Sequence, residues 1–244
     1  NYISINSGCM HACGHDGHTS MLLGAARYLK ESGNFSGTIY FIFQPNEENT
    51  LGAQAMIDDG LFKKFNSDEV YALHNIPGMA LGSFAFKEGT ITASENLFEI
   101  TLEGLGGHAA LPHMSKDTIT IGSQIITALQ TIISRKLNPA DNGVVSVTEF
   151  ITDGKKNVLP GRGIIRGDAR ALSDQANSLI ETNIKQIAQG VGNAHDIKVE
   201  VLYKRNCPIT INSPTQTKIA NSAANNLVGE AKVNSKCEPK LFSE

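Results

Sequence analysis

Residues 38–43, Thr-Ile-Tyr-Phe-Ile-Phe, form an almost wholly apolar run that follows turn-forming residues at 34–37. A strand that is apolar on both faces suits a parallel sheet covered on both sides. Helical patterns occur at 19–30 and 52–65, and a second short strand is expected at 69–73. Elements that alternate at these lengths predict an α/β layered domain with a mostly parallel sheet.

The pattern changes after residue 93, where strand, helix, strand, strand, helix and strand follow one another. The strands are expected at 97–103, 144–151, 164–172 and 197–203, and the helices at 118–133 and 173–189, the second capped by Ser173. This βαββαβ order is typical of a ferredoxin-like α+β sandwich. A helical pattern returns at 215–227. We therefore predict three segments: the first part of the α/β domain (1–93), an inserted ferredoxin-like domain (94–208) and a truncated second part of the α/β domain (209–244).

Charge and composition argue against several kinds of partner. The 244 residues carry a net charge of −3 and have a pI near 6.2, so we expect neither nucleic acid nor an anionic membrane as a partner. No apolar stretch approaches the roughly 18 residues that a membrane-spanning helix needs. Four scattered cysteines favour a reducing compartment, and we predict a cytoplasmic protein. Because the chain begins at Asn1 and both ends look cut, a lost signal peptide would leave no trace in it.

Potential metal ligands gather at three places in the first segment. Residues 10–18 read Met-His-Ala-Cys-Gly-His-Asp-Gly-His, a Glu47-Glu48 pair follows the first predicted strand, and His74 follows the second. Thiolate sulfur, imidazole nitrogen and carboxylate oxygen together are typical of a hydrolytic transition-metal centre. The alternative is a buried thiol beside surface histidines, but the density of histidine and cysteine among glycines favours the metal site.

The chemistry of these side chains indicates distinct roles. Cys13 can bridge two divalent ions, and His15 can bind one of them while a neighbour orients its ring. Adjacent side chains at a strand end point in different directions, so one glutamate can bind a metal while the other takes a proton from metal-bound water. Open α/β sheets place their sites at the carboxyl ends of strands, and this position favours His74 as a ligand over a structural role.

Further candidates lie in the predicted inserted domain. His108 follows a glycine pair between a strand and a helix, where an imidazole could donate to the oxyanion of a tetrahedral intermediate. Asn157, Arg166 and Arg170 are candidates for holding a substrate carboxylate, and a loop or strand-surface role is the alternative for each.

Four motifs of this chain resemble the M20 metallopeptidase family. They are Met-His-Ala-Cys-Gly-His-Asp-Gly-His-Thr at 10–19, Phe-Ile-Phe-Gln-Pro-Asn-Glu-Glu at 41–48, Tyr-Ala-Leu-His-Asn-Ile-Pro at 71–77 and Gly-Leu-Gly-Gly-His-Ala-Ala-Leu-Pro-His at 104–113. They follow the order of the family, and the first is highly specific. The resemblance is to the aminoacylase/amidohydrolase branch, which includes hippurate hydrolases, auxin-conjugate hydrolases and N-acetyl-diaminopimelate deacetylases.

The resemblance implies a centre of two divalent metal ions. Cys13 looks like the ligand that bridges them, with His15 and His74 on one ion and Glu48 on the other. The expected ions are zinc, manganese, cobalt or nickel. The branch usually supplies one more histidine ligand near its C-terminus, and this chain ends before any match to it.

The resemblance also implies catalytic and substrate-binding roles. Glu47 looks like the general acid/base, and His108 looks like the oxyanion-stabilising histidine of a lid domain, while Asn157 and His113 are assigned to substrate binding. We predict hydrolysis of the amide bond of N-acyl amino acids by metal-bound water, in a homodimer assembled through the inserted domain. The alternatives are a metallo-dipeptidase of the same superfamily and a non-catalytic metal-binding or assembly fragment. Residues 1–244 alone are expected to have little or no activity.

Overall fold

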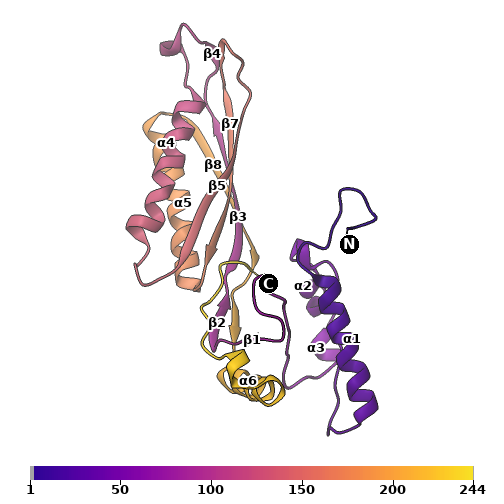
Figure 1. The fold of residues 1–244 in the computed structure, drawn as a ribbon. Coiled ribbons are helices and arrows are strands. Elements are labelled where there is room, and N and C mark those ends of the chain that lie inside the picture. Colours follow the sequence, from indigo (N-terminus) through magenta and orange to yellow (C-terminus); the bar gives the residue numbers. More distant parts are fainter. Residues whose placement is uncertain (1–2, 244) are drawn as a thin grey trace. The chain divides into compact units, whose positions relative to one another are not determined.

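The computed structural model describes residues 3–243. Contacts divide the chain into a first unit, residues 1–83, and a second unit, residues 84–244 (Figure 1). The first unit contains helices, and the second combines helices with strands, so the chain has a mixed α/β fold. No helix within residues 3–243 has both the length and the apolar composition needed to cross a membrane.

Glycines in the left-handed conformation flank the longest helix of the first unit. The helices of this unit are α1 (His15–Ser32), α2 (Gly52–Asp58), α3 (Leu61–Lys64) and the 3-10 turn η1 (Glu47–Asn49). α1 begins after Gly14 and ends at Gly33, and both glycines adopt the left-handed conformation (φ 81° and 57°) that favours glycine. The helix predicted at 19–30 therefore forms, and it begins four residues earlier than expected.

The two strands predicted for the first unit are not formed. Residues 38–43 and 69–73 pair with no strand among residues 3–243. Their apolar side chains are partly exposed, for example Ile39 at 41% and Phe43 at 48%. A strand needs a neighbour that exchanges main-chain hydrogen bonds with it, and the helical first unit offers none. The apolar pattern indicates that these side chains suit a buried environment. A strand also requires a neighbouring strand, which the pattern does not specify. The predicted parallel sheet is therefore not present in the described part of this chain.

The second unit contains a four-stranded antiparallel sheet in the order β5-β7-β3-β8. Its strands are β3 (Ser94–Glu103), β5 (Gly143–Thr152), β7 (Arg162–Ala171) and β8 (Lys198–Cys207). Figure 1 shows that α4 (Thr118–Thr131), continued by the π-helix η3 (Ile132–Lys136), and α5 (Asp174–Ala194) cover one face of this sheet. The chain order β3-α4-β5-β7-α5-β8 is the βαββαβ order predicted for this region. Ser173 caps α5 as expected, because its side chain accepts the Ala176 N–H at 3.1 Å.

One apolar core joins the sheet to its two helices. Alternate residues of β3, including Ile100 and Leu102, point toward the helices and are fully buried. They belong to the same cluster as Ile125 of α4 and Ile180 of α5. Burial of each such side chain stabilises the fold by about 1.5–3 kcal/mol. The helices are therefore fixed to the sheet by packing of the amphipathic faces that the sequence predicts.

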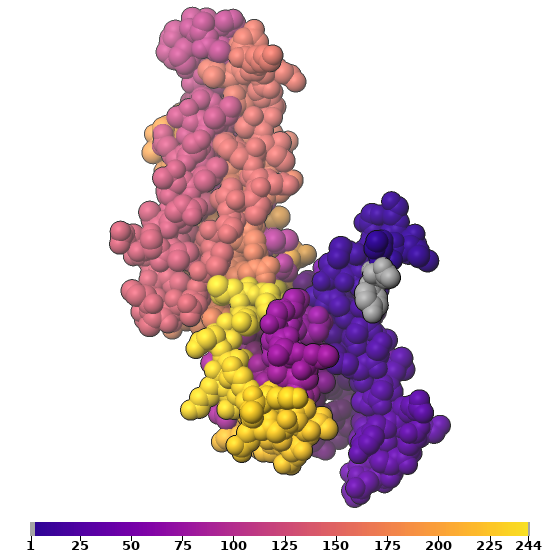
Figure 2. Space-filling view, viewed as in Figure 1, coloured from indigo at the N-terminus to yellow at the C-terminus, as the bar shows by residue number. Residues whose placement is uncertain are grey.

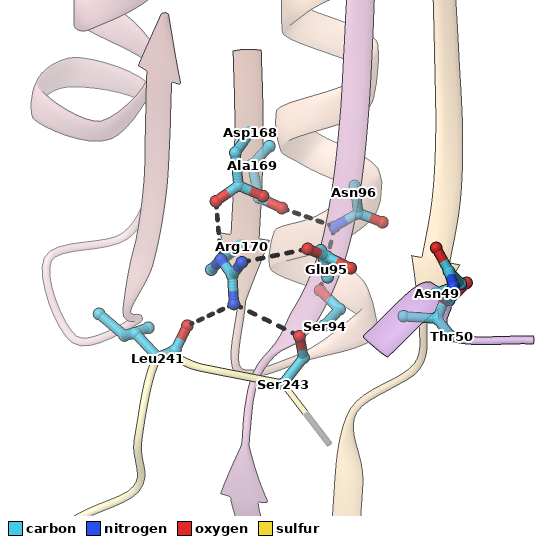
Figure 3. A network of polar contacts seen from close by, with 10 residues as sticks. All are labelled: Asn49, Thr50, Ser94, Glu95, Asn96, Asp168, Ala169, Arg170, Leu241 and Ser243. Carbon is cyan, nitrogen blue, oxygen red and sulfur yellow. Dashed lines mark hydrogen bonds and ion pairs between the residues drawn. The ribbon is translucent and has the colours of Figure 1, made fainter. Parts of the chain in front are cut away.

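Ion pairs join strands on the opposite face of this sheet. Arg166 of β7 contacts Glu99 at 2.7 Å and Glu149 at 3.0 Å. Arg170 of the same strand contacts Glu95 at 3.2 Å. Arg170 also contacts Asp168, Leu241 and Ser243 (Figure 3). Both guanidinium groups bind carboxylates of their own unit, which favours the strand-surface role over substrate binding.

Shorter elements complete the second unit. β1 (Phe84–Ala85) pairs with β10 (Val233–Asn234), β2 (Gly89–Thr92) with β9 (Thr210–Asn212), and β4 (Gly107–His108) with β6 (Val158–Leu159). The remaining helices are η2 (Pro112–Met114), α6 (Pro214–Val228), which was predicted at 215–227, and η4 (Glu230–Lys232). The β4–β6 ribbon and η2 form a tip that projects beyond the long sheet at one end of the second unit (Figure 2).

Candidate metal centre

Three potential ligands from separate segments meet in the first unit. Cys13 lies in the loop before α1, His15 is the first residue of α1, and His74 lies in a segment without regular structure. One donor atom from each lies within 4.8 Å of the others. Cys13 Sγ is 3.4 Å from His74 Nε2. The structure thus brings together the three residues that the sequence assigns to one ion.

A hydrogen bond orients the ring of His74. Its Nδ1 lies 2.6 Å from the main-chain oxygen of Asn75, and a carbonyl oxygen can only accept. Nδ1 therefore carries the proton of the neutral ring, and the lone pair of Nε2 is directed to the side where Cys13 lies. Histidines that bind metals usually donate the N–H of their second ring nitrogen to a carbonyl or carboxylate in this way.

Both predicted carboxylates lie beside His15. Glu47 Oε2 is 3.3 Å from His15 Nε2, and Glu48 Oε1 is 3.7 Å from His15 Nδ1. Residues in the left-handed conformation (φ 54° and 56°) bound η1 on both sides, so the chain turns sharply there. The donor atoms of His15, Glu47 and Glu48 form a second group within 4.8 Å of one another. The sharing of one ion by Cys13 and Glu48 stays a prediction.

His18 joins these residues although the motif analysis gives it no role. Its ring centroid lies 4.3 Å from that of His74 and 5.3 Å from that of His15. Burial lowers the pKa of His18 below its ordinary value, the hydrogen bond with Asn75 acts in the opposite direction, and the nearby His74 and His15 lower it further. The spacing from His15 is a signal that could have found it, because residues i and i+3 share a helix face.

The donor set fits a divalent metal centre. A thiol, two imidazoles and two carboxylates supply the sulfur, nitrogen and oxygen atoms that zinc and neighbouring transition metals bind. Because His74 Nδ1 bonds to a main-chain oxygen, Nε2, which lies 3.4 Å from Cys13 Sγ, is the ring nitrogen that can act as a ligand. The residues present therefore fit one ion held by Cys13, His15 and His74, and they place carboxylates beside it for a second.

The other predicted site residues belong to the tip of the second unit. His108 lies in β4, and its Nδ1 accepts the main-chain N–H of Ala110 at 3.1 Å. The main-chain oxygen of Asn157 accepts the N–H of Ala109 at 3.0 Å, so the loops that carry His108 and Asn157 are joined. His113 lies in η2 of the same tip. The structure brings these three residues into one region of the second unit and the five metal-site residues into one region of the first.

The sequence model of peptidase family M20/M25/M40 matches this chain over residues 1–244. The chain belongs to this family. The hippurate hydrolase of Campylobacter jejuni is 40% identical to this M20 protein over 243 residues, which are 100% of this chain and 63% of the relative. The N-acetyl-L-cysteine deacetylase of Bacillus subtilis is 37% identical over 224 residues, or 91% of this chain and 53% of the relative. The resemblance predicted from the four motifs is confirmed.

Solved structures show the same fold. The YXEP protein of Bacillus subtilis, described as a dinuclear metal binding peptidase of the M20 family, is 28% identical with a TM-score of 0.78, over 97% of this chain and 60% of that one. The aminobenzoyl-glutamate utilization protein of Klebsiella pneumoniae is 22% identical with a TM-score of 0.70, which shows the fold alone. This M20 protein, as given by its 244 residues, spans less than two thirds of the length of these relatives.

Proposed function

We propose that this M20 protein hydrolyses the amide bond of N-acyl amino acids with the help of two divalent metal ions. The observation that carries the proposal is the convergence of Cys13, His15 and His74 with the carboxylates of Glu47 and Glu48. The substrate class comes from the relatives named hippurate hydrolase and N-acetyl-L-cysteine deacetylase, because both names describe removal of an acyl group from an amino-acid nitrogen.

Four residues are proposed to hold the ions. Cys13, His15 and His74 would bind one ion, and Glu48 would bind the other together with Cys13. Zinc, manganese, cobalt or nickel suits this mixture of donors. When bound, such ions would lower the pKa of a coordinated water, to about 7 in the case of zinc, and would polarise the acyl carbonyl. Cys13 would bind as the thiolate, and metal affinity should rise with pH, because a protonated thiol cannot bind the ion.

Glu47 is the proposed general base and acid. Its carboxylate lies 3.3 Å from Nε2 of His15, beside the ligand group, and its side chain is 32% exposed whereas that of Glu48 is 70% exposed. The more shielded carboxylate suits proton transfer, because competing bulk water reaches it less. Glu47 would take the proton of the attacking water and return it to the departing amine nitrogen.

His108 is proposed to stabilise the oxyanion from the predicted inserted domain (94–208), which would act as a lid. Because Nδ1 of His108 accepts the Ala110 N–H, the neutral ring carries its proton on Nε2 and can donate it to a developing negative charge. Asn157 and His113 lie in the same tip and are proposed to contact the substrate. A homodimer assembled through the predicted inserted domain (94–208) and a cytoplasmic location are proposed from the sequence.

The decisive test compares wild type with Glu47→Gln in the complete product of the gene, since residues 1–244 span 63% of the hippurate hydrolase relative. Hippurate, N-acetyl amino acids and dipeptides are offered in parallel, and metal content is measured by elemental analysis. We expect acyl amino acids to be hydrolysed, and Glu47→Gln to abolish turnover while retaining the metal. Near-normal hydrolysis by Glu47→Gln would refute the role of Glu47.

The same assay distinguishes the alternatives. Cleavage of dipeptides in preference to acyl amino acids would indicate a metallo-dipeptidase with the same ligands but another leaving group. Metal binding without hydrolysis of any of these amides would indicate a non-catalytic metal-binding protein. Glu48→Gln serves as the matched control, because it should lose metal rather than proton transfer.

A further inference from the structure

His18 contacts the metal-ligand residues without belonging to either group of donor atoms. Those groups are Cys13, His15 and His74, and His15, Glu47 and Glu48. His18 Nε2 instead accepts the main-chain N–H of Asn75 at 3.1 Å, and the side-chain amide of Asn75 lies against the same ring nitrogen. The lone pair of this nitrogen is therefore used by the main chain of Asn75, and the Asn75 side chain packs beside it.

Asn75 connects His18 to the proposed ligand His74. The N–H of Asn75 points to His18, whereas its carbonyl oxygen accepts the Nδ1–H of His74 at 2.6 Å. The carbonyl thus sets the ring orientation in which His74 Nε2 lies 3.4 Å from Cys13 Sγ. If the main chain at Asn75 rotated, this carbonyl would turn away and the ring of His74 would lose its orientation.

Gly14 provides space for the Asn75 side chain. A Cβ placed on Gly14 would lie 2.7 Å from Asn75 Oδ1 and 2.8 Å from its Nδ2, and Gly14 has a φ of 81° that favours glycine. His18 follows four residues later in the first turn of α1, where its N–H bonds to the Gly14 oxygen at 3.2 Å. Asn75 is therefore held against the start of α1 by close packing on Gly14 and by hydrogen bonding to His18.

We propose that His18 is a positioning residue, which anchors Asn75 to the first turn of α1 and so keeps His74 directed at Cys13. This inference rests on the metal centre proposed above. His18 would act on the metal through Asn75 and His74, in the way that outer hydrogen-bond partners orient metal-binding histidines. The ring centroid of His18 also lies 5.3 Å from that of His15 and 4.3 Å from that of His74.

The test uses two amide side chains of different reach. A glutamine at position 18 can place an amide near the position of the imidazole Nε2, where its oxygen accepts or its nitrogen donates. An asparagine has the same chemistry but is one methylene shorter, so it cannot reach Asn75. Wild type, His18→Gln and His18→Asn, each as residues 1–244, are titrated with Co²⁺. Thiolate-to-cobalt charge-transfer absorption reports Cys13 ligation, competition with Zn²⁺ gives the affinity, and circular dichroism checks α1.

We expect His18→Asn to bind Co²⁺ about 10–100-fold more weakly, with a weaker charge-transfer band, and His18→Gln to stay within a few-fold of wild type. Equal affinities and spectra in all three proteins would overturn the role of His18. An equal loss in both variants would also overturn it, since His18 would then be a direct ligand. If wild type showed no charge-transfer band, the metal centre itself would be refuted. If the His18→Asn protein no longer forms α1, wild type is compared with His18→Gln alone. A large loss of Co²⁺ affinity in His18→Gln would then contradict the proposal.

Discussion

Gly52 lies against the segment that carries the two glutamates of the proposed metal centre. It opens α2 and is buried, and a Cβ placed on it would lie 2.6 Å from the carbonyl carbon of Pro45 and closer still to the oxygen. Pro45 lies two residues before Glu47 and three before Glu48. This neighbour is main chain, so it cannot rotate aside as the end of a long side chain can. Gly52→Ala must therefore displace the segment that carries both carboxylates.

Two effects oppose each other in Gly52→Ala. Alanine favours a helix interior by up to about 1 kcal/mol over glycine, and less at a first helical position. Against this, the two carbons must separate by at least about 1 Å to reach the ~3.5 Å at which carbon atoms ordinarily meet, and overpacking of this kind typically costs about 1–3 kcal/mol. Metal-ligand distances are held within about 0.2 Å, so a displacement of this size should remove Glu48 as a ligand.

We expect Gly52→Ala in the complete gene product to keep one ion and to bind the other at least ~10-fold more weakly, with turnover reduced in parallel. Metal content after dialysis against limiting Zn²⁺ measures ion binding, and hydrolysis of hippurate measures turnover. Gly24→Ala is the matched control, because a Cβ at Gly24 in α1 meets nothing within 4 Å. It should keep both ions and stabilise the helix by about 0.5–1 kcal/mol. If Gly52→Ala retained both ions at wild-type affinity, the steric reasoning would be wrong.

Two further predictions concern the second unit. His108→Gln should lower turnover by about 10²–10³-fold while leaving metal content unchanged, and unaltered turnover would contradict the oxyanion role. Lys185, 2.6 Å from Glu181, and Arg205, 2.8 Å away, hold the pKa of Glu181 below its ordinary 4.5. Because the folded state favours the charged form of Glu181, these ion pairs stabilise the fold at pH values above 4.5. This stabilisation is lost as the pH falls through the lowered pKa of Glu181. The difference in urea midpoint between wild type and Glu181→Gln should therefore shrink from neutral to acid pH, and a constant difference would contradict this.

The second unit could be predicted from the sequence because its signals are local. Alternate apolar residues mark β3 and β7, and the side chains of Asp117 and Ser173 accept N–H groups at the starts of α4 and α5. Each signal is contained within the element that it specifies. The antiparallel order then follows from connections that the chain itself contains.

The first unit was predicted less well because its structure depends on backbone conformation and on partners. The helix expected at 52–65 is divided into α2 and α3 by Gly60, which adopts φ 88°. The apolar run at 38–43 has no neighbouring strand among residues 3–243. His18 was missed because the helix was expected to start at 19, whereas the left-handed Gly14 starts it at His15 and places both histidines in its first turn. The grouping of Cys13, His15 and His74 was expected, because the motif resemblance does not depend on these details, and their role as metal ligands stays a prediction.

The first unit has few buried residues, and metal binding is expected to stabilise it. None of the residues of α1 is buried, so packing holds this helix weakly. Cys13 and His74 are 61 positions apart, and an ion bound by both would close that loop only in the folded chain. Zinc at about 100 times its Kd should stabilise the folded form by about 2.7 kcal/mol.

Hydrogen exchange can locate this effect within the chain. The N–H of Gly17 bonds to the Gly14 oxygen at 2.9 Å and that of Asn75 to His18 at 3.1 Å, so both bonds break when the site opens. Their exchange should slow by about 100-fold with zinc at that concentration and recover with a chelator. The amides of α5 in the second unit are the internal control, because their core contains none of the ligands. A bound ion stabilises only the structure that its ligands hold together. A centre built from Cys13, His15 and His74 would therefore be contradicted if zinc slowed exchange in α5 as much as at Gly17 and Asn75, or did not slow it at Gly17 and Asn75.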